Sequence, residues 1–366
     1  MRRVLFSIAI LLFLNTLSAK NVYKFIVGTY TNQTLSKGIY TIEFDTDKKI
    51  INTQLSADNV FDPSYLALTP DGKYVYSISE RGLNSSISAF RFDKNSGKMS
   101  FINRVQGRGA DPCYVAVSDH HVITANYSGG NVSVFGRNPD GSLSEAIQSV
   151  QHFGKSINAQ RQTKPYVHQT IFSPDRHFVL VNDLGTDFVT SYRYNMNSGE
   201  KVLTVFDSLK VKAGSGPRHS VFSKNGKYLY VIHELDGTLT VAGFIKGKLS
   251  LIDETTVVRK ENIQTGAADI HISPDGKFLY ATNRGTANDI SCFRIGKNGK
   301  LNFIQQISVS GIGPRNFAIT KDGRYVLVAN QKSNQIVVFQ RNSGTGTLTE
   351  TELKINLQAP VCLVEY

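Results

Sequence analysis

The chain is dominated by a unit of about fifty residues that recurs along its length. One copy begins at Asp62-Pro63-Ser64-Tyr65, enters an apolar segment, turns at Asp71-Gly72 and continues through a second apolar segment, Tyr74 to Ser79. The turn position of six successive copies is occupied by Gly72, Asp119, Arg176, Gly226, Gly276 and Gly323, at steps of 47, 57, 50, 50 and 47 residues. Such a chain must stack one supersecondary unit, in a row or in a ring.

The residues between the turns favour β-strands. Asp-Gly and Asn-Gly pairs, as at Asp275-Gly276, supply the positive φ angles of tight hairpin turns. Tyr, Val, Ile and Phe are enriched between the turns, and we find no sustained helical periodicity beyond residue 19. We therefore predict an all-β, seven-bladed β-propeller with three or four short strands in each blade. An open β-solenoid is the alternative, but its repeats are shorter, at about 20–29 residues.

The two ends of the chain supply the seventh blade. Tyr23 to Val27 matches the second strand of the unit, Gly38 to Phe44 the third, and Ala359 to Leu363 the first. Pairing of the N- and C-terminal strands in one blade closes the ring and leaves no open radial edge. The sequence thus predicts a single propeller domain over residues 20–366.

The first 19 residues have the pattern of a signal peptide. Arg2 and Arg3 precede an apolar run, Val4 to Leu14, and small residues allow cleavage after Ala19. The run is too short to cross a bilayer, which takes about twenty residues, and no later segment is long and apolar enough. We predict a signal peptide over residues 1–19 and an exported protein, either periplasmic or secreted.

Charge and cysteine content limit the kinds of ligand and partner that the chain is expected to bind. The formal net charge of +12 falls to +10 without Arg2 and Arg3, and a basic balance favours anionic ligands. No run of five or six basic residues marks a nucleic-acid-binding arm, so we expect no nucleic acid. Cys113, Cys292 and Cys362 allow at most one disulfide and have no metal-ligand spacing. We expect no metal and no cofactor.

Two positions of the repeat differ in chemistry from blade to blade. The first lies eight residues before the turn position, or two residues further on in the second copy, and reads Ser64, Cys113, His168, Arg218, Ala268 and Arg315. The second lies eight residues after it and reads Glu80, Tyr127, Leu184, Glu234, Arg284 and Gln331. Positions that vary in this way are not needed to support the blade.

Both positions are expected at one mouth of the central channel. The first two strands of a blade run antiparallel, so the start of one and the end of the other lie at the same end of the ring. His168, Arg218, Glu234, Arg284 and Arg315 would then converge in a concave site. Arginines there recognise carboxylate or phosphate. The alternative is a set of solvated charges, or charges that pair across the channel.

Several motifs resemble those of the lactonase family of seven-bladed propellers. They include Gly216-Pro217-Arg218-His219, Glu234-Leu235-Asp236, Asn283-Arg284-Gly285 and Gly313-Pro314-Arg315-Asn316-Phe317. The family contains bacterial 6-phosphogluconolactonase and the fungal carboxy-muconate lactonizing enzyme, and the resemblance runs from Tyr23 to the C-terminus. It implies catalytic residues at His168, Arg218, Glu234 and Arg284.

The chain departs from the family pattern at two places. Tyr166 stands two residues before His168, where family members often have a histidine, and this puts the exact substrate in doubt. His233 stands where asparagine is common. We further expect substrate contacts from polar residues at or next to the two variable positions, namely Arg315, His219, Asn283, Asn126, Asn330, Glu80 and Asp183.

Lactone hydrolysis has chemical requirements that these residues meet. A water must lose a proton as it attacks the carbonyl carbon, and His168 or Glu234 is the candidate general base. Arg218 or Arg284 would stabilise the oxyanion, while the other of the two and Arg315 would hold an anionic group of the substrate. No Gly-x-Ser-x-Gly motif is present, so a serine nucleophile has no support.

The sequence therefore predicts a lactone hydrolase similar to 6-phosphogluconolactonase, acting on a small anionic lactone. Cyclisation of carboxy-cis,cis-muconate is the enzymatic alternative, because it uses the same acid, base and arginines. A non-catalytic propeller that binds a ligand or a protein is the alternative from another class, since propellers have many functions.

Overall fold

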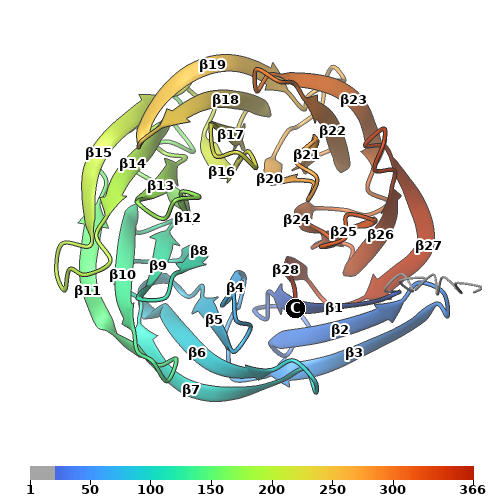
Figure 1. Ribbon diagram of the computed structural model, residues 1–366, viewed down its shortest axis with the longest axis horizontal. Coiled ribbons are helices and arrows are strands. Elements are labelled where there is room, and N and C mark those ends of the chain that lie inside the picture. The colour runs from blue at the N-terminus through green and yellow to red at the C-terminus, as the bar shows by residue number, and fades with distance from the viewer. Residues whose placement is uncertain (1–20) are drawn as a thin grey trace, which may run out of the picture.

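The computed structural model describes residues 21–366, so the predicted signal peptide lies outside the described residues. The predicted seven-bladed propeller is confirmed: seven four-stranded antiparallel sheets are arranged in a ring around a central axis (Figure 1). A short 3-10 helix, η1 (Gly82–Asn84), interrupts the strands in the first blade. Within residues 21–366, no helix has the length and apolar character that a membrane crossing requires.

We number the blades in chain order and give the strands of each from the channel outward. Blade 1 comprises β4 (Leu66–Leu68), β5 (Tyr74–Ser79), β6 (Ser86–Asp93) and β7 (Lys98–Gln106). Blade 2 comprises β8 (Pro112–Val117), β9 (His121–Asn126), β10 (Asn131–Arg137) and β11 (Leu143–Gln151). Blade 3 comprises β12 (Val167–Phe172), β13 (Phe178–Asp183), β14 (Phe188–Tyr194) and β15 (Leu203–Lys210).

The next three blades repeat this order. Blade 4 comprises β16 (Pro217–Phe222), β17 (Tyr228–His233), β18 (Thr238–Ile245) and β19 (Lys248–Thr256). Blade 5 comprises β20 (Ala267–Ile272), β21 (Phe278–Asn283), β22 (Asp289–Ile295) and β23 (Leu301–Ser308). Blade 6 comprises β24 (Pro314–Ile319), β25 (Tyr325–Asn330), β26 (Gln335–Arg341) and β27 (Leu348–Asn356).

Blade 7 combines the two ends of the described chain, as the sequence predicts. It comprises β28 (Pro360–Glu365), β1 (Val22–Thr29), β2 (Ile39–Asp45) and β3 (Ile50–Ala57). β28 pairs antiparallel with β1, with Leu363 opposite Val27. Figure 1 shows β28 on the channel side of this sheet and β3 at the rim. The ring is closed by backbone hydrogen bonds, which removes the radial edges that an open sheet would expose.

Five of the six turn positions that set the repeat have left-handed backbone conformations, and Asp119, the turn position of the second copy, does not. Gly72, Gly226, Gly276 and Gly323 have φ values of 68°, 70°, 75° and 72°. Arg176, aligned with them in a looser copy, also has a positive φ of 59°. The alignment therefore holds in blade 3, although a non-glycine residue pays a steric cost in this region.

The core is divided among the seams between blades. Within the described residues, seven buried hydrophobic clusters occur, each joining two neighbouring blades. Tyr230 of blade 4, for example, packs in one cluster with Leu279 and Phe293 of blade 5. The three cysteines are buried and unpaired. Because the apolar contacts lie between blades, the ends of the strands at the channel are free to carry polar side chains.

Candidate active site

A β-bulge in the innermost strand re-aims one residue in each of six blades. The register of this strand against its neighbour shifts at one place in every case, leaving one residue of the strand unpaired in five blades and two, Ala268 and Asp269, in β20. The bulges fall at Cys113, His168, Arg218, Ala268, Arg315 and Val361. Five of these are the first variable position of the repeat. Bulges commonly redirect side chains next to functional sites, and here they explain why the chemistry of this position varies.

The second variable position directly follows the second strand of each blade, and Glu234 is its central member. Its Oε2 atom accepts hydrogen bonds from Nε of Arg218 at 2.9 Å and from Nη2 of Arg284 at 3.0 Å. Its Oε1 atom accepts from Nη2 of Arg161 at 2.6 Å. The structure thus brings the predicted Arg218, Glu234 and Arg284 into direct contact and adds Arg161.

These arginines control the ionisation of the carboxylate. Burial acts to raise the pKa of Glu234, but the charges of Arg284, Arg218 and Arg161 outweigh it and hold that pKa well below its usual range. Burial lowers the pKa of Arg284 to about 10, against the opposing effect of Glu234. Glu234 is therefore a fixed anion that organises three guanidinium groups, and it is a poor proton acceptor near neutral pH.

His168 lies beside this cluster and is 4% exposed. Its ring makes edge contacts with the rings of Tyr127 and His219, at centroid distances of 5.5 and 5.2 Å. Nδ1 is 3.7 Å from Sγ of Cys113, and no hydrogen bond to Nε2 is found within residues 21–366. Burial, followed by the charge of Arg218, lowers the pKa of His168 well below its ordinary value. The imidazole is neutral near pH 7 and has a basic nitrogen available.

His219 lies next to Arg218 and contacts a buried acid, Asp269, that is not among the predicted site residues. Nη1 of Arg218 is 3.4 Å from Nε2 of His219, and a guanidinium can only donate, so Nε2 is the acceptor. Nδ1 of His219 then donates to Asp269 at 2.7 Å, and Nε2 of His271 contacts the other carboxylate oxygen at 2.9 Å. Nη1 of Arg218 also donates to the carbonyl of Ala268. His219, itself held by Asp269, therefore helps to position the guanidinium of Arg218.

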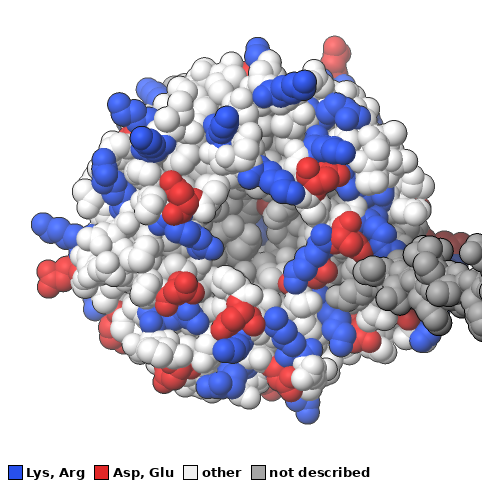
Figure 2. Space-filling model, viewed as in Figure 1, with Lys and Arg blue, Asp and Glu red and all other residues white. Residues whose placement is uncertain are grey.

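The opposite side of the mouth is built around Glu80. Its Oε2 atom accepts hydrogen bonds from the hydroxyls of Ser64 at 2.7 Å and Tyr30 at 2.8 Å. Nη2 of Arg315 donates to the Tyr30 hydroxyl at 2.8 Å, and its guanidinium lies over the Tyr30 ring. Around the mouth, four arginines face two glutamates, which leaves a net positive charge. Figure 2 shows one face of the ring, on which exposed Lys, Arg, Asp and Glu side chains alternate around the central hollow.

Aromatic rings close the channel below the mouth. The rings of Tyr65 and Tyr114 stack at 4.0 Å, and the His219 ring meets both edge-on at 6.0 and 5.3 Å. On the far side of these rings lies a separate cavity of about 510 Å³, to which His271 contributes. A small cavity of about 10 Å³ lies against these rings, and Arg218, Arg315 and Cys113 contribute to its lining.

Four of the predicted substrate contacts are buried inside their blades. Asn126 donates to Ser133, Asn283 accepts from the backbone of Gly266, and Asn330 donates to the carbonyl of Val309. These three amides and Asp183 have no exposed surface. The structure therefore does not bring them into the group formed by the glutamates and arginines.

Arg161, Tyr30 and Asp269 belong to the site but were not predicted from the sequence. Arg161 lies on the connection between β11 and β12, outside the repeat, where no internal comparison applies. Tyr30 directly follows β1, as Glu80 follows β5, so it is the seventh member of the second variable position. Extending the repeat to the terminal blade would have found it. Asp269 lies one residue after the first variable position, inside the bulge of β20.

Comparison with known families agrees with this architecture. Residues 24–365 match the family described as lactonase, 7-bladed β-propeller. The chain belongs to the lactonase family.

Named relatives of this lactonase cover nearly the whole chain. A 6-phosphogluconolactonase of Formosa agariphila is 35% identical over 93% of this chain and 99% of its own length. A 6-phosphogluconolactonase of Bacillus subtilis is 34% identical over 92% of this chain and 96% of its own. The solved structure of a periplasmic gluconolactonase from Pseudomonas aeruginosa has a TM-score of 0.88 and 31% identity, covering 94% of this chain and 99% of its own. These relatives favour lactone hydrolysis over cyclisation or binding alone.

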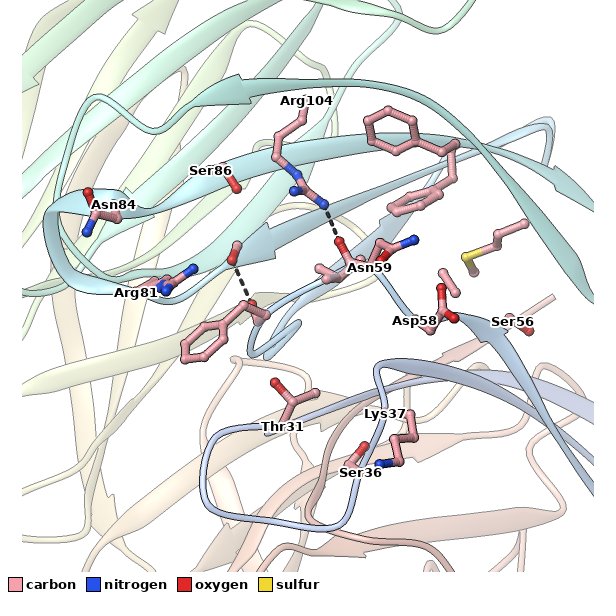
Figure 3. Close-up of a pocket in the computed structure, with 17 residues that line it drawn as sticks. Thr31, Ser36, Lys37, Ser56, Asp58, Asn59, Arg81, Asn84, Ser86 and Arg104 are labelled. Atoms are coloured by element: carbon pink, nitrogen blue, oxygen red, sulfur yellow. Dashed lines mark hydrogen bonds between the residues drawn. The ribbon is translucent and has the colours of Figure 1, made fainter.

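A second concavity of this lactonase lies at the seam between blades 7 and 1, with a volume of about 950 Å³ (Figure 3). Lys37 and Asp58 line its blade 7 side, and Arg81 and Arg104 its blade 1 side. Arg104 donates to the backbone carbonyl of Asn59, as Figure 3 shows. These charged side chains are exposed, unlike the buried charges at the channel mouth. The mouth is therefore the stronger candidate for the catalytic site.

Proposed function

We propose that this lactonase hydrolyses the lactone of a phosphorylated sugar acid, with 6-phosphoglucono-δ-lactone as the first substrate to test. The observation that carries the proposal is a neutral, buried His168 next to three arginines gathered on Glu234. A base and cationic oxyanion donors are what lactone opening requires. Two relatives named 6-phosphogluconolactonase support this substrate.

In the proposed mechanism, His168 is the general base. Its Nε2 atom accepts a proton from water as the water oxygen bonds to the lactone carbonyl carbon. The depressed pKa of His168 keeps this nitrogen unprotonated at neutral pH, whereas the lone pairs of Glu234 are committed to arginines. This step converts the carbonyl into a tetrahedral oxyanion and His168 into an imidazolium.

Arg218 and Arg284 stabilise the oxyanion. Each uses one N–H to hold Glu234 and keeps further donors for a ligand, since a guanidinium has five N–H groups. Collapse of the intermediate breaks the bond between the carbonyl carbon and the ring oxygen. The imidazolium of His168 returns its proton to that oxygen, so the products are a hydroxyl group and a carboxylic acid, which ionises in water.

The direct test is the rate at which purified residues 20–366 open freshly prepared 6-phosphoglucono-δ-lactone, measured above spontaneous opening in buffer. Unphosphorylated gluconolactone serves as the parallel substrate. We expect clear acceleration of the phosphorylated lactone. If neither lactone opens faster than in buffer, the proposed activity is wrong.

We also propose export through the signal peptide at residues 1–19. The basic and apolar pattern of these residues supports it, as does the relative described as a periplasmic gluconolactonase. The test is expression of the full chain in a Gram-negative host, followed by fractionation and N-terminal sequencing. Export predicts a mature chain that starts at Lys20 outside the cytoplasm. Full-length chain found only in the cytoplasm would contradict it.

A further inference from the structure

Arg161 differs from the other three arginines of the mouth in its place and its exposure. Arg218, Arg284 and Arg315 occupy repeat positions, whereas Arg161 lies on the connection formed by residues 152–166. This connection is longer than any other inter-blade connection that the structure describes, the next being residues 257–266. The Arg161 side chain is 44% exposed, against 18% for Arg284 and 2% for Arg218. A ligand entering the mouth can therefore reach Arg161.

A buried glutamine fixes the segment that carries Arg161. Gln162 has no exposed surface, and its Nε2 atom donates to the carbonyl of Leu184 at 2.8 Å and to Asp187 at 2.7 Å. The side chain of Asn158 accepts a hydrogen bond from the backbone N–H of Arg161 at 3.0 Å. The backbone at Arg161 is thus held by neighbours on both sides.

Asp183 fixes the two ends of the same connection. One carboxylate oxygen contacts Nδ1 of His152 at 2.9 Å, and the other accepts from the backbone N–H of Tyr166 at 2.9 Å. Asp183 itself ends β13 and is fully buried. The connection is therefore an ordered part of the mouth. Asp183 contributes to the mouth by fixing the two ends of this connection.

The guanidinium of Arg161 is anchored at one nitrogen only. Nη2 donates to Oε1 of Glu234 at 2.6 Å and to the Tyr127 hydroxyl at 3.2 Å. Nε and Nη1 have no hydrogen-bond partner within residues 21–366. A guanidinium carries five N–H donors, so Arg161 is oriented by Glu234 and still presents donors to a ligand.

We propose that Arg161 determines substrate specificity by binding the anionic group of the substrate, the phosphate of a phosphorylated lactone, while Glu234 holds the guanidinium in place. This inference rests on the proposed function. Phosphate accepts paired, charge-assisted hydrogen bonds from a guanidinium, and an unphosphorylated lactone offers these donors no anionic partner. Arg315, the other candidate for this role, has its guanidinium over the Tyr30 ring and bonded to the Tyr30 hydroxyl.

The experiment compares kcat/KM for 6-phosphoglucono-δ-lactone and gluconolactone in the wild type, Arg161→Gln and Arg161→Lys. Lys155→Gln is the matched control, because Lys155 is exposed on the same connection and its replacement removes the same charge. We expect Arg161→Gln to lower kcat/KM for the phosphorylated lactone by about 10-fold to 100-fold, mainly through KM. Gluconolactone should change by less than about twofold, and Arg161→Lys should fall between because it loses the planar fork.

Each other outcome has a defined meaning. If Arg161→Gln lowers kcat/KM equally for both lactones, the specificity role is wrong. The same holds if Lys155→Gln lowers kcat/KM for the phosphorylated lactone as much as Arg161→Gln does. A wild type that opens both lactones with the same kcat/KM would overturn it too, and would leave the proposed lactone hydrolysis standing. A wild type that accelerates neither lactone would contradict the proposed function, and the inference would fall with it.

Discussion

The two glutamates of the channel mouth occupy the same position of the repeat, yet their partners differ. Glu234 holds the guanidinium groups of Arg161, Arg218 and Arg284, whereas Glu80 accepts hydrogen bonds from hydroxyls. We define the Glu234 side as Arg161, His168, Arg218, Glu234 and Arg284, and the Glu80 side as Tyr30, Ser64, Glu80 and Arg315. The comparison shows that the fold fixes where a side chain emerges, while neighbouring blades decide its chemistry. The Glu234 side has both a base and oxyanion donors.

The largest expected effect is the loss of the base on the Glu234 side. His168→Ala removes the imidazole that accepts the proton of the attacking water, so kcat for the phosphorylated lactone should fall by about 10² to 10⁴-fold. Steady-state kinetics above the spontaneous rate measures it. His177→Gln, at an exposed histidine of the same blade, is the control and should retain full activity. Comparable losses in the two variants would argue against a specific role for His168.

Among these variants, the largest loss of stability is expected from the buried network in which Asp269 contacts His219 and His271, below the Glu234 side. Asp269→Asn removes the charge that contacts His219 and His271 while keeping the size of the side chain. Breaking a buried charged network in this way should lower the free energy of unfolding by about 3 kcal/mol. Urea denaturation measures it. Asp253→Asn, which removes a partly exposed partner of Lys300, should cost less than about 1 kcal/mol.

The pH profile distinguishes the electrostatic contributions of the two sides. A general base must be unprotonated, so kcat/KM should fall at acid pH only below the depressed pKa of His168, under its ordinary value of 6.5. Positive charges lower this pKa, so removing one should raise it and move the acid limb to higher pH. Arg218→Gln should move the limb further than Arg315→Gln, in the order of their effects on His168. An acid limb above pH 6.5 in the wild type would be inconsistent with a buried neutral His168.

The smallest effect is expected on the Glu80 side. Tyr30→Phe removes the hydroxyl that links Glu80 and Arg315 but keeps the ring under the guanidinium. The loss of a neutral hydrogen bond at the rim of the mouth should change kcat/KM by less than about threefold. Kinetics on the phosphorylated lactone, with circular dichroism as a check of folding, measures it. A loss as large as that in His168→Ala would place the chemistry on the Glu80 side.

The fold was predictable from the sequence because local signals repeat. The Asp-Gly and Asn-Gly turns place the strands, and β5 begins and ends at the predicted residues Tyr74 and Ser79. The ring closure by β28 and β1 also followed, since each end of the chain carries only part of one repeat unit. In a repeat protein the copies can be aligned with one another. A blade with weak turn signals is therefore located by the spacing of the blades with clear ones.

The site was predictable only where it coincides with the repeat. The contact of Arg218 with Glu234 and Arg284 follows from two repeat positions at one end of antiparallel strands. The position of Arg161 depends on hydrogen bonds made by Gln162 in a connection with no counterpart in other blades. The depressed pKa of Glu234 depends on which charges meet across three blades, and no spacing along the chain encodes that.

The most direct test of the difference between the two sides is to measure Glu234→Gln and Glu80→Gln in one assay. The substitutions are chemically identical and fall at equivalent positions of the repeat. We predict that Glu234→Gln lowers kcat/KM for 6-phosphoglucono-δ-lactone by at least about tenfold, because it releases charge-assisted hydrogen bonds from three arginines, whereas Glu80→Gln changes it by less than about threefold. Equal losses in the two variants, or a larger loss in Glu80→Gln, would contradict the assignment of the chemistry to the Glu234 side.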